Sequence, residues 1–452
     1  MKKLSTFQIA ILVIFGSLGA AGVLLFSLFA SGANSNDIGN VTIWGTFPED
    51  PIKLVLKDAS DLDSRLSGVT YVQKDPTTFE KDLTEALASG RGPDLFFMRQ
   101  DFAVHDGNKT LHIPFDQLSQ SQFNSTFLNA AQPFIGIDGV VAVPILADPL
   151  VLYWNKDILA TAGYSNPPDT WDQVSPMVKK LVKKDDAGTL VKSGIAMGEY
   201  RNIPSAKDIL TALFFQAGGS LTTRDTEGVI RSALAGQNNL QAAVIALSFY
   251  TKFADPAQEA YSWSRALKDA KAMFAAGDLG LYIGHASDRA AIVEANPNLN
   301  FGISGLPQLK SSATKVNVAT VYGLALARNT KNQQGSLTVT YLLAAEGIAQ
   351  PLSQSLGMTS ALRDVLEGTQ TAVKKDPSSS GKALQALVKT ASKSEQDLFN
   401  QQSAIAASWL DPNPEQTDSL FRSMIEDTVS GSAKLTEVVQ RADKQIGEII
   451  GL

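Results

Sequence analysis

Residues 139–174 decide the expected fold of this chain, and their sequence is GVVAVPILADPLVLYWNKDILATAGYSNPPDTWDQV. The first half is an apolar run rich in β-branched residues, interrupted by Pro144 and by the sequence ADP at 147–149. A continuous apolar run is typical of a buried strand, and proline is tolerated in strands mainly at edges or irregularities. We therefore expect a strand that leaves one sheet here and enters another, as a crossover between two lobes does. Beyond it, Asp169 and Thr170 form an N-cap signature that begins an amphipathic helix.

The segments before this crossover predict an α/β lobe. Apolar strands at VTIWGTF (41–47), GVTYVQ (68–73) and DLFFM (94–98) alternate with helical patterns. The last of them lacks polar alternation, which is typical of a buried parallel strand. Ligands of open α/β sheets bind beyond the carboxyl ends of the strands. We therefore expect Trp44 and Asp101 to lie near a binding site.

The segments after the crossover predict a second lobe and a return to the first. Helices and strands alternate up to residue 300, NFGISGLP (300–307) is typical of the return crossover, and the C-terminal part is helical apart from a loop at 374–382. Strands at about 144–150 and 306–320 are then the expected hinges. The predicted organisation is a membrane anchor or signal segment at 1–33, a linker at 34–40, lobe 1 at 41–146 and 301–346, and lobe 2 at 147–300 and 347–452.

The N-terminus predicts a membrane anchor. Residues 7–30 carry no charge and follow two lysines, Lys2 and Lys3. A helix of this length spans roughly 36 Å, enough for a hydrocarbon layer of about 30 Å, and the lysines favour a cytoplasmic N-terminus. The alternative is a cleaved signal peptide with Ser31 and Ala33 before the cut. The apolar run is longer than the usual core of about 7–15 residues, so an uncleaved transmembrane helix is the favoured interpretation.

Composition excludes several classes of function. The chain has 452 residues, a net charge of −6, no cysteine and three histidines. An acidic chain without basic clusters does not predict a nucleic-acid partner, and the absence of cysteine excludes disulfides and thiolate chemistry. No phosphate-binding loop, nucleophile elbow or zinc-binding HExxH motif occurs. We therefore expect no catalytic residue, no metal site and no cofactor, which favours a binding protein over an enzyme.

Several segments of the chain, in order, resemble the extracellular solute-binding proteins of ABC importers, specifically family 1 with its maltose and multiple-sugar binders. The crossover carries the spacing Pro144, Asp148, Tyr153, Trp154 and NKD, followed by a TWD sequence at a helix start. Each motif alone is weak evidence for the resemblance, but the order of the motifs is specific to the family. The resemblance covers nearly all of the chain after residue 40. The other segments are VTIWGTF near the start, SGRGPDLFFMRQDF (89–102), FAAGDLGLYIG (274–284), NPNLNFGISGLP (296–307) and VYGLALARNTKN (321–332).

This resemblance implies an α/β, two-lobe periplasmic-binding-protein-like fold of type II, with discontinuous lobes joined by crossover strands. It also implies capture of a small solute, a carbohydrate above all, and delivery to ABC permease subunits by a monomer held at the extracytoplasmic face of the membrane. A membrane-anchored sensor or scaffold with the same fold is the alternative. A third interpretation, an extracellular hydrolase, would need a pair of carboxylates on facing lobes.

Nine residues are candidates for solute binding, because sugars need aromatic faces and fixed polar groups. Core packing is the alternative for the aromatic residues, and capping or turn formation for the acids. His285 and Ser287 stand where oligosaccharide-binding relatives often carry a tryptophan, which favours a smaller sugar, a polyol or a non-sugar solute. The candidates are Trp44, Glu49, Asp101, Asp148, Trp263, His285, Ser287, Tyr322 and Trp409.

Overall fold

The computed structural model describes residues 38–451, apart from residues 226, 311, 313 and 368–390. The expected membrane anchor at 7–30 and the expected loop at 374–382 lie outside these described residues. Within them, no helix has the length and apolar character needed to cross a membrane.

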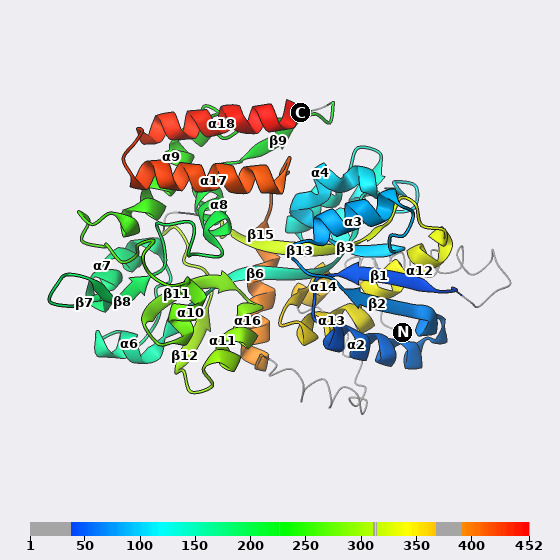
Figure 1. The fold of residues 1–452 in the computed structure, drawn as a ribbon, viewed down its shortest axis with the longest axis horizontal. Coiled ribbons are helices and arrows are strands. Elements are labelled where there is room, and N and C mark those ends of the chain that lie inside the picture. Colours follow the sequence, from blue (N-terminus) through cyan, green and yellow to red (C-terminus); the bar gives the residue numbers. More distant parts are fainter. Residues whose placement is uncertain (1–37, 226, 311, 313, 368–390, 452) are drawn as a thin grey trace, which may run out of the picture.

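One branched sheet runs through the whole molecule. Its strands follow the order β2-β1-β3-β13-β6-β11-β8-β7, and Figure 1 shows lobe 1 at one end of this path and lobe 2 at the other. The strands β1, β2 and β3 are parallel, as the continuous apolar sequence of β3 predicted for that strand. The bounds are β1 (Val41–Gly45), β2 (Val69–Gln73), β3 (Leu95–Arg99), β6 (Val143–Asn155), β7 (Lys183–Lys184), β8 (Leu190–Ile195), β11 (Leu279–His285) and β13 (Asn317–Leu326).

Strand β6 is the crossover that the sequence predicted. Its first half pairs with β13 in lobe 1, and its second half pairs with β11 and with β12 (Phe301–Ser304) in lobe 2. Twelve of its thirteen residues are buried, which explains the continuous apolar run. At Pro149 and Leu150 the partner of β6 changes from β13 to β11, so this one strand joins the parts of the sheet that belong to the two lobes.

Helices cover the sheet in each lobe. Those of lobe 1 bury apolar residues against β1, β2 and β3, and those of lobe 2 bury them around β8, β11 and the second half of β6. The helices of lobe 1 are α2 (Glu49–Leu62), α3 (Phe79–Ala88), α12 (Gln333–Ala344) and α13 (Glu346–Ser355). The main helices of lobe 2 are α7 (Trp171–Leu181), α8 (Ala206–Gln216), α9 (Asn239–Thr251), α10 (Ala270–Ala275), α17 (Pro414–Val429) and α18 (Leu435–Gly451).

The two hydrophobic cores divide the chain slightly differently from the expected lobes. Leu352 and Leu366 pack in the core of lobe 1, because α13 lies against α2. Leu306 packs in the core of lobe 2, because β12 pairs with β6 there. The helices α17 and α18 belong to the core of lobe 2, as expected for the C-terminal part. Helix α16 (Lys393–Ala404) lies between the lobes beside β6 and β13.

Candidate functional site

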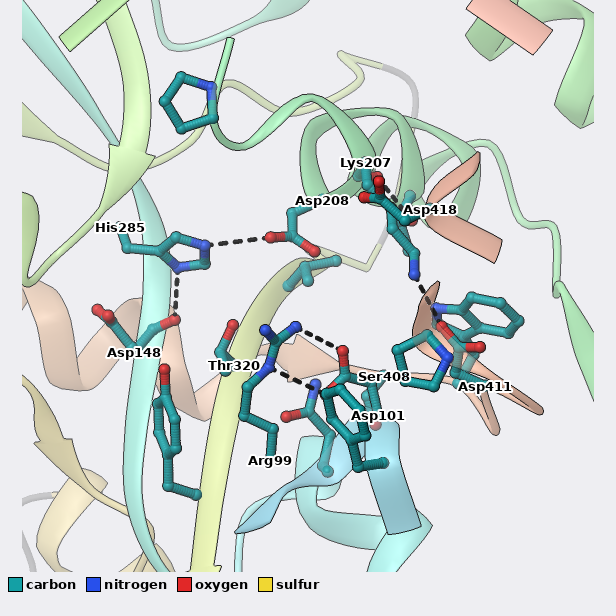
Figure 2. A pocket seen from close by; sticks show the side chains of 18 of the residues that line it. Arg99, Asp101, Asp148, Lys207, Asp208, His285, Thr320, Ser408, Asp411 and Asp418 are labelled. Atoms are coloured by element: carbon teal, nitrogen blue, oxygen red, sulfur yellow. Dashed lines mark hydrogen bonds and ion pairs between the residues drawn. The ribbon is translucent and has the colours of Figure 1, made fainter. Parts of the chain in front are cut away.

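A cavity of about 610 Å³ lies where the two lobes meet. Lobe 1 contributes the residues that follow β3, and lobe 2 contributes the first turns of α8 and α17. Asp148 on β6 and Thr320 on β13 line it from the crossover strands, as Figure 2 shows. The cavity thus touches both lobes and both strands that connect them.

The lobe 1 side of the cavity is built at the carboxyl end of β3. The short helix η2 (Gln100–Phe102) follows the strand and turns Asp101 back toward Arg99. The Arg99 guanidinium donates through Nε to Oδ1 of Asp101 at 3.1 Å and through Nη2 to Oδ2 at 2.5 Å. The charge of Asp101 is the main cause of a raised pKa for Arg99. Oε1 of Gln100 accepts from the backbone N–H of Val321 at 2.7 Å, which ties this loop to β13.

His285 connects the hinge strand β6 to helix α8. Its Nδ1 lies 2.9 Å from the carbonyl oxygen of Asp148, and its Nε2 lies 3.1 Å from Oδ2 of Asp208. A carbonyl can only accept, and a carboxylate also accepts, so both ring nitrogens donate and the imidazole is positively charged. Burial lowers the pKa of His285, but the hydrogen bond to Asp208 and the charges of Asp148 and Asp208 outweigh it and raise the pKa to about 10.

Asp148 is a buried carboxylate at the floor of the cavity. The residue is 4% exposed, and burial raises its pKa against the opposing effects of the His285 charge and the Ser287 hydrogen bonds. Its Oδ1 accepts from the backbone N–H of Ser287 at 3.1 Å, and its Oδ2 accepts from the Ser287 hydroxyl at 2.6 Å. These two bonds fix the carboxylate and leave part of its acceptor capacity open.

The His285 pair predicts a pH dependence of stability. The pKa of His285 is about 10 in the folded chain against an ordinary value of 6.5. The charged histidine therefore stabilises the folded state fully below pH 6.5, and this contribution is lost as the pH rises through about 10. Denaturant unfolding at about pH 6 and about pH 10 is expected to show a larger loss of stability in the wild-type chain than in His285→Gln. Equal losses of stability in the wild-type chain and in His285→Gln would contradict a charged pair between His285 and Asp208.

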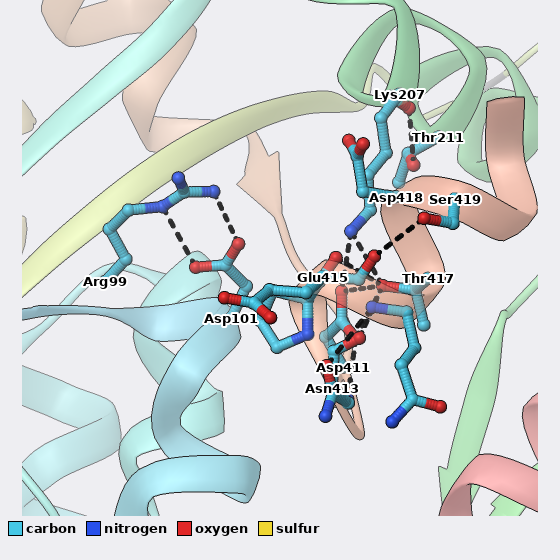
Figure 3. A network of polar contacts seen from close by, with 12 residues as sticks. Arg99, Asp101, Lys207, Thr211, Asp411, Asn413, Glu415, Thr417, Asp418 and Ser419 are labelled. Atoms are coloured by element: carbon cyan, nitrogen blue, oxygen red, sulfur yellow. Dashed lines mark hydrogen bonds and ion pairs between the residues drawn. The ribbon is translucent and has the colours of Figure 1, made fainter. Parts of the chain in front are cut away.

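A second polar group holds the lobe 2 side of the cavity. Nζ of Lys207 lies 2.8 Å from Oδ2 of Asp411 and 2.8 Å from Oγ1 of Thr417. Asp411 is 0% exposed, and its carboxylate also accepts from the backbone N–H of Asn413 at 3.1 Å. Figure 3 shows this group facing the Arg99–Asp101 pair from the opposite lobe. The half-buried Trp409 lies beside it, with Lys207 over its ring at 5.6 Å.

Six of the nine candidate residues line the cavity. They come from different elements: the loop after β3, the hinge strands β6 and β13, the end of β11 with the turn after it, and the segment before α17. Sequence spacing therefore located parts of the cavity on both lobes. The six are Asp101, Asp148, His285, Ser287, Tyr322 and Trp409.

The other three candidates lie away from the cavity. Trp44 is part of β1, and its ring stacks under Nζ of Lys74 at 3.6 Å. Glu49 is in the first turn of α2 and pairs with Lys53 at 2.9 Å, the helix role that was its alternative. Trp263 is 0% exposed in the core of lobe 2. Its Nε1 donates to a side-chain oxygen of Asn202 at 3.0 Å, which satisfies the indole within the core.

Sequence reasoning missed several charged and polar residues of the cavity. Thr320 could have been found, because it precedes Tyr322 by two residues on a strand and so shares its face. Lys207 and Asp208 carried no such signal, since charged residues at a helix start are ordinary. Among the described residues, no group of three or more histidine, aspartate and glutamate side chains could hold a metal ion.

A direct contact also joins the lobes through residues that do not line the cavity. Arg224 ends strand β9 (Thr222–Arg224), which pairs with β10 (Ile230–Ser232) in a hairpin of lobe 2. Its Nη1 donates to the carbonyl oxygen of Ile135 in lobe 1 at 3.1 Å. Its Nε is buried without a partner within the described chain, and burial lowers the pKa of Arg224. This contact favours the arrangement in which the lobes lie close together.

Arg224→Ala is expected to loosen that arrangement. A hydrogen bond to a charged group contributes about 1.5–3 kcal/mol, so its loss shifts the population toward more open lobes and increases the radius of gyration in small-angle scattering. Arg231→Ala is the matched control, because Arg231 is exposed in the same hairpin and pairs with Asp225 of its own lobe. If the two variants scatter alike, the contact does not hold the lobes together.

Comparisons with known proteins agree with this geometry. Residues 68–349 match the family model of the bacterial extracellular solute-binding proteins. A binding-protein relative from Brucella abortus (strain 2308) is 23% identical over 277 residues, which is 61% of this chain and 64% of the relative. The match thus spans somewhat less than two thirds of that relative. A maltotriose-binding protein of Pyrococcus abyssi is 25% identical over 143 residues, 31% of this chain and 30% of that protein.

Solved structures share the fold over nearly the whole length. A cyclo/maltodextrin-binding protein in complex with maltotetraose has a TM-score of 0.68 at 16% identity, covering 93% of this chain and 98% of that one. UgpB from Mycobacterium tuberculosis in complex with glycerophosphocholine has a TM-score of 0.68 at 15% identity, covering 91% and 98%. At these identities the likeness shows the two-lobe fold.

Proposed function

The chain belongs to the bacterial extracellular solute-binding protein family, and from this premise we propose that it captures a small carbohydrate or polyol for an ABC importer. The solute is held in the cavity between the lobes and is passed to the permease subunits. The protein works as a monomer at the extracytoplasmic face of the membrane, tethered by an N-terminal helix at residues 7–30. It carries out no catalytic step.

The observation that supports this proposal is the composition of the cavity from both lobes. Arg99 and Asp101 face it from lobe 1, and Lys207 and Asp411 face it from lobe 2. A solute that touches both sides binds the closed arrangement more tightly than the open one, and this difference in affinity drives closure. Rotation is taken up where β6 and β13 pass between the lobes.

The chemistry of the cavity suits a hydroxylated solute. Its polar side chains are held in place by their own hydrogen bonds, so their free acceptors and donors are preorganised for hydroxyl groups. Trp409 supplies an apolar face on which a sugar ring can stack. The relatives named after maltotriose and maltodextrin support a carbohydrate as the first class to test.

The test is a thermal-stability and tryptophan-fluorescence screen of the full chain in detergent, against sugars, polyols, phosphorylated sugars and amino acids. A solute at a hundredfold excess over its dissociation constant adds about 2.7 kcal/mol of stability and raises the melting temperature by several degrees. Trp409→Ala is expected to abolish the shift, whereas Trp44→Ala, outside the cavity, keeps it. A folded sample that responds to no sugar or polyol would refute the proposal.

A further inference from the structure

The charged side chains that line the cavity are predominantly acidic. Seven of them are carboxylates and three are cations, so the binding site has an excess of negative charge when all are ionised. The carboxylates are Asp101, Asp148, Asp208, Asp288, Asp411, Glu415 and Asp418, and the cations are Arg99, Lys207 and His285.

Each of these cations is already paired with a carboxylate of the cavity. Arg99 pairs with Asp101, Lys207 with Asp411, and His285 with Asp208. A phosphate or carboxylate group on the solute would therefore meet no uncompensated cation among the described residues that line the cavity. Placing such an anion beside excess carboxylates is unfavourable, because like charges repel most strongly where water is excluded.

Two carboxylates of the cavity form no ion pair within the described chain, although the charge of His285 also acts on one of them, Asp148. Asp288 pairs with Lys271 and Asp418 with Arg422, both from outside the cavity lining. Glu415 and Asp148 are the two that remain, and they differ in burial. Glu415 is exposed to solvent, whereas Asp148 is buried and receives hydrogen bonds from Ser287 alone.

The surroundings of Asp148 contain polar groups that also have no partner. Thr320 is its cross-strand neighbour and is 9% exposed, yet its hydroxyl makes no hydrogen bond to any described residue. Gln100 is 8% exposed, and its amide nitrogen likewise has no acceptor within the described chain. Both side chains line the cavity, so these groups are available to hydrogen-bond a solute there. The Tyr322 hydroxyl, on the same strand as Thr320, lines the cavity as well.

We propose that the solute is a carbohydrate that carries an amine, with its ammonium group against Asp148 and its hydroxyls bonded to Thr320 and Gln100. This inference rests on the proposed function and names the solute class of the same site. An ammonium group has three donors and one positive charge. His285 is a single cation shared by Asp148 and Asp208, so an ammonium group adds a second positive charge there, whereas a hydroxyl at the same place adds none.

The affinity of matched sugars that differ in one substituent tests the inference. Calorimetric titration of the full chain with glucosamine, glucose, N-acetylglucosamine and glucose 6-phosphate, and with the corresponding disaccharides, measures the effect of charge at constant shape. A hydroxyl and an ammonium group can both donate to the Asp148 carboxylate, but only the ammonium group brings a positive charge into a cavity with excess carboxylates. The amine is therefore expected to bind at least about tenfold more tightly than the hydroxyl or acetamide, which corresponds to about 1.4 kcal/mol, and the phosphate is expected not to bind.

Variants locate the ammonium group. Asp148→Asn keeps the shape of the side chain and removes its charge, so the ratio of amine to hydroxyl affinity is expected to fall toward one. Glu85→Gln, which removes an exposed carboxylate of α3, is the control for net charge and is expected to keep the ratio. Thr320→Val removes the unpartnered hydroxyl. It is expected to weaken the binding of both the amine sugar and the hydroxyl sugar.

The outcomes separate this inference from the proposed function. Neutral sugars that bind as tightly as their amines overturn the inference and leave solute capture standing. An amine preference that survives in Asp148→Asn overturns the placement against Asp148. A folded wild-type chain that binds none of the sugars in either series overturns the inference, and with it the carbohydrate assignment.

Discussion

Asp411→Ala is expected to lower the free energy of unfolding by about 3–5 kcal/mol, because removing one partner of a buried ion pair leaves the other charge uncompensated. The carboxylate of Asp411 is fully buried and accepts from Lys207, Thr417 and Asn413. Its loss leaves the ammonium group of Lys207 without a carboxylate and frees the start of α17. Denaturant unfolding measures the change.

The same substitution is expected to weaken solute binding, because Trp409 and the first turn of α17 depend on the Asp411 group for their position. Asp411→Asn keeps part of the hydrogen bonding and is expected to lose less stability than the alanine variant. Asp186→Ala removes an exposed carboxylate of lobe 2 and is expected to change stability by no more than about 0.5 kcal/mol. An Asp411→Ala loss as small as that of Asp186→Ala would contradict the structural role of the pair.

Trp263→Ala is expected to destabilise the chain by about 3–5 kcal/mol and to leave solute affinity unchanged. A large aromatic side chain removed from a closed core costs both its burial and the cavity left behind, and Trp263 is among the largest fully buried side chains of the described chain. The amide oxygen of Asn202 also loses its indole donor. Unfolding experiments measure the first effect, and titration with the solute measures the second.

The conservative variant makes this prediction specific. Trp263→Phe retains most of the buried area, so it is expected to lose less stability than Trp263→Ala. It is also expected to leave the affinity for the solute unchanged. A large loss of affinity in a well-folded Trp263→Phe sample would restore Trp263 as a binding residue. Trp409→Phe is the counterpart in the cavity. It is expected to reduce the free energy of solute binding more than it reduces the free energy of unfolding.

The fold could be predicted because its main signals are local. The apolar run of β6 and the proline-containing break at Pro149 are properties of neighbouring residues, and they correspond directly to a strand shared by the two lobes. Strand β3 of lobe 1 follows from its lack of alternation in the same way. The predicted residue boundaries of the lobes agree less well with the two cores. The positions of α13 and β12 depend on which distant surface each one covers.

The residues that line the cavity could be predicted only where they lie on strands or directly after them. Asp101, Asp148 and Tyr322 follow from the rule for strand ends and from the crossover pattern. Trp263 and Trp409 could not be told apart, because both lie in short connections before helices in lobe 2. Burial separates them: Trp263 is fully buried in the core of lobe 2, whereas the half-buried Trp409 packs against that core and also lines the cavity.

The partners of the charged residues could not be predicted from the sequence, for a related reason. Lys207 and Asp411 are 204 positions apart, and Asp208 and His285 are 77 apart. Each charged residue by itself is typical of a solvent-exposed helix start or loop. Only the fold brings the partners together, so neither the cation pairing nor the lack of an ion pair at Asp148 could be inferred from spacing.

The position of β13 between β3 and β6 has a consequence for synthesis of the chain on the ribosome. Strands β3 and β6 are complete once residue 155 has been made, but the strand that joins them ends at Leu326. The nascent first lobe therefore carries two unpaired strand edges while the first part of lobe 2 is translated. Such edges pair readily with other chains. Synthesis of lobe 1 therefore begins before that of lobe 2, but its sheet is completed only after the first part of lobe 2 has been made.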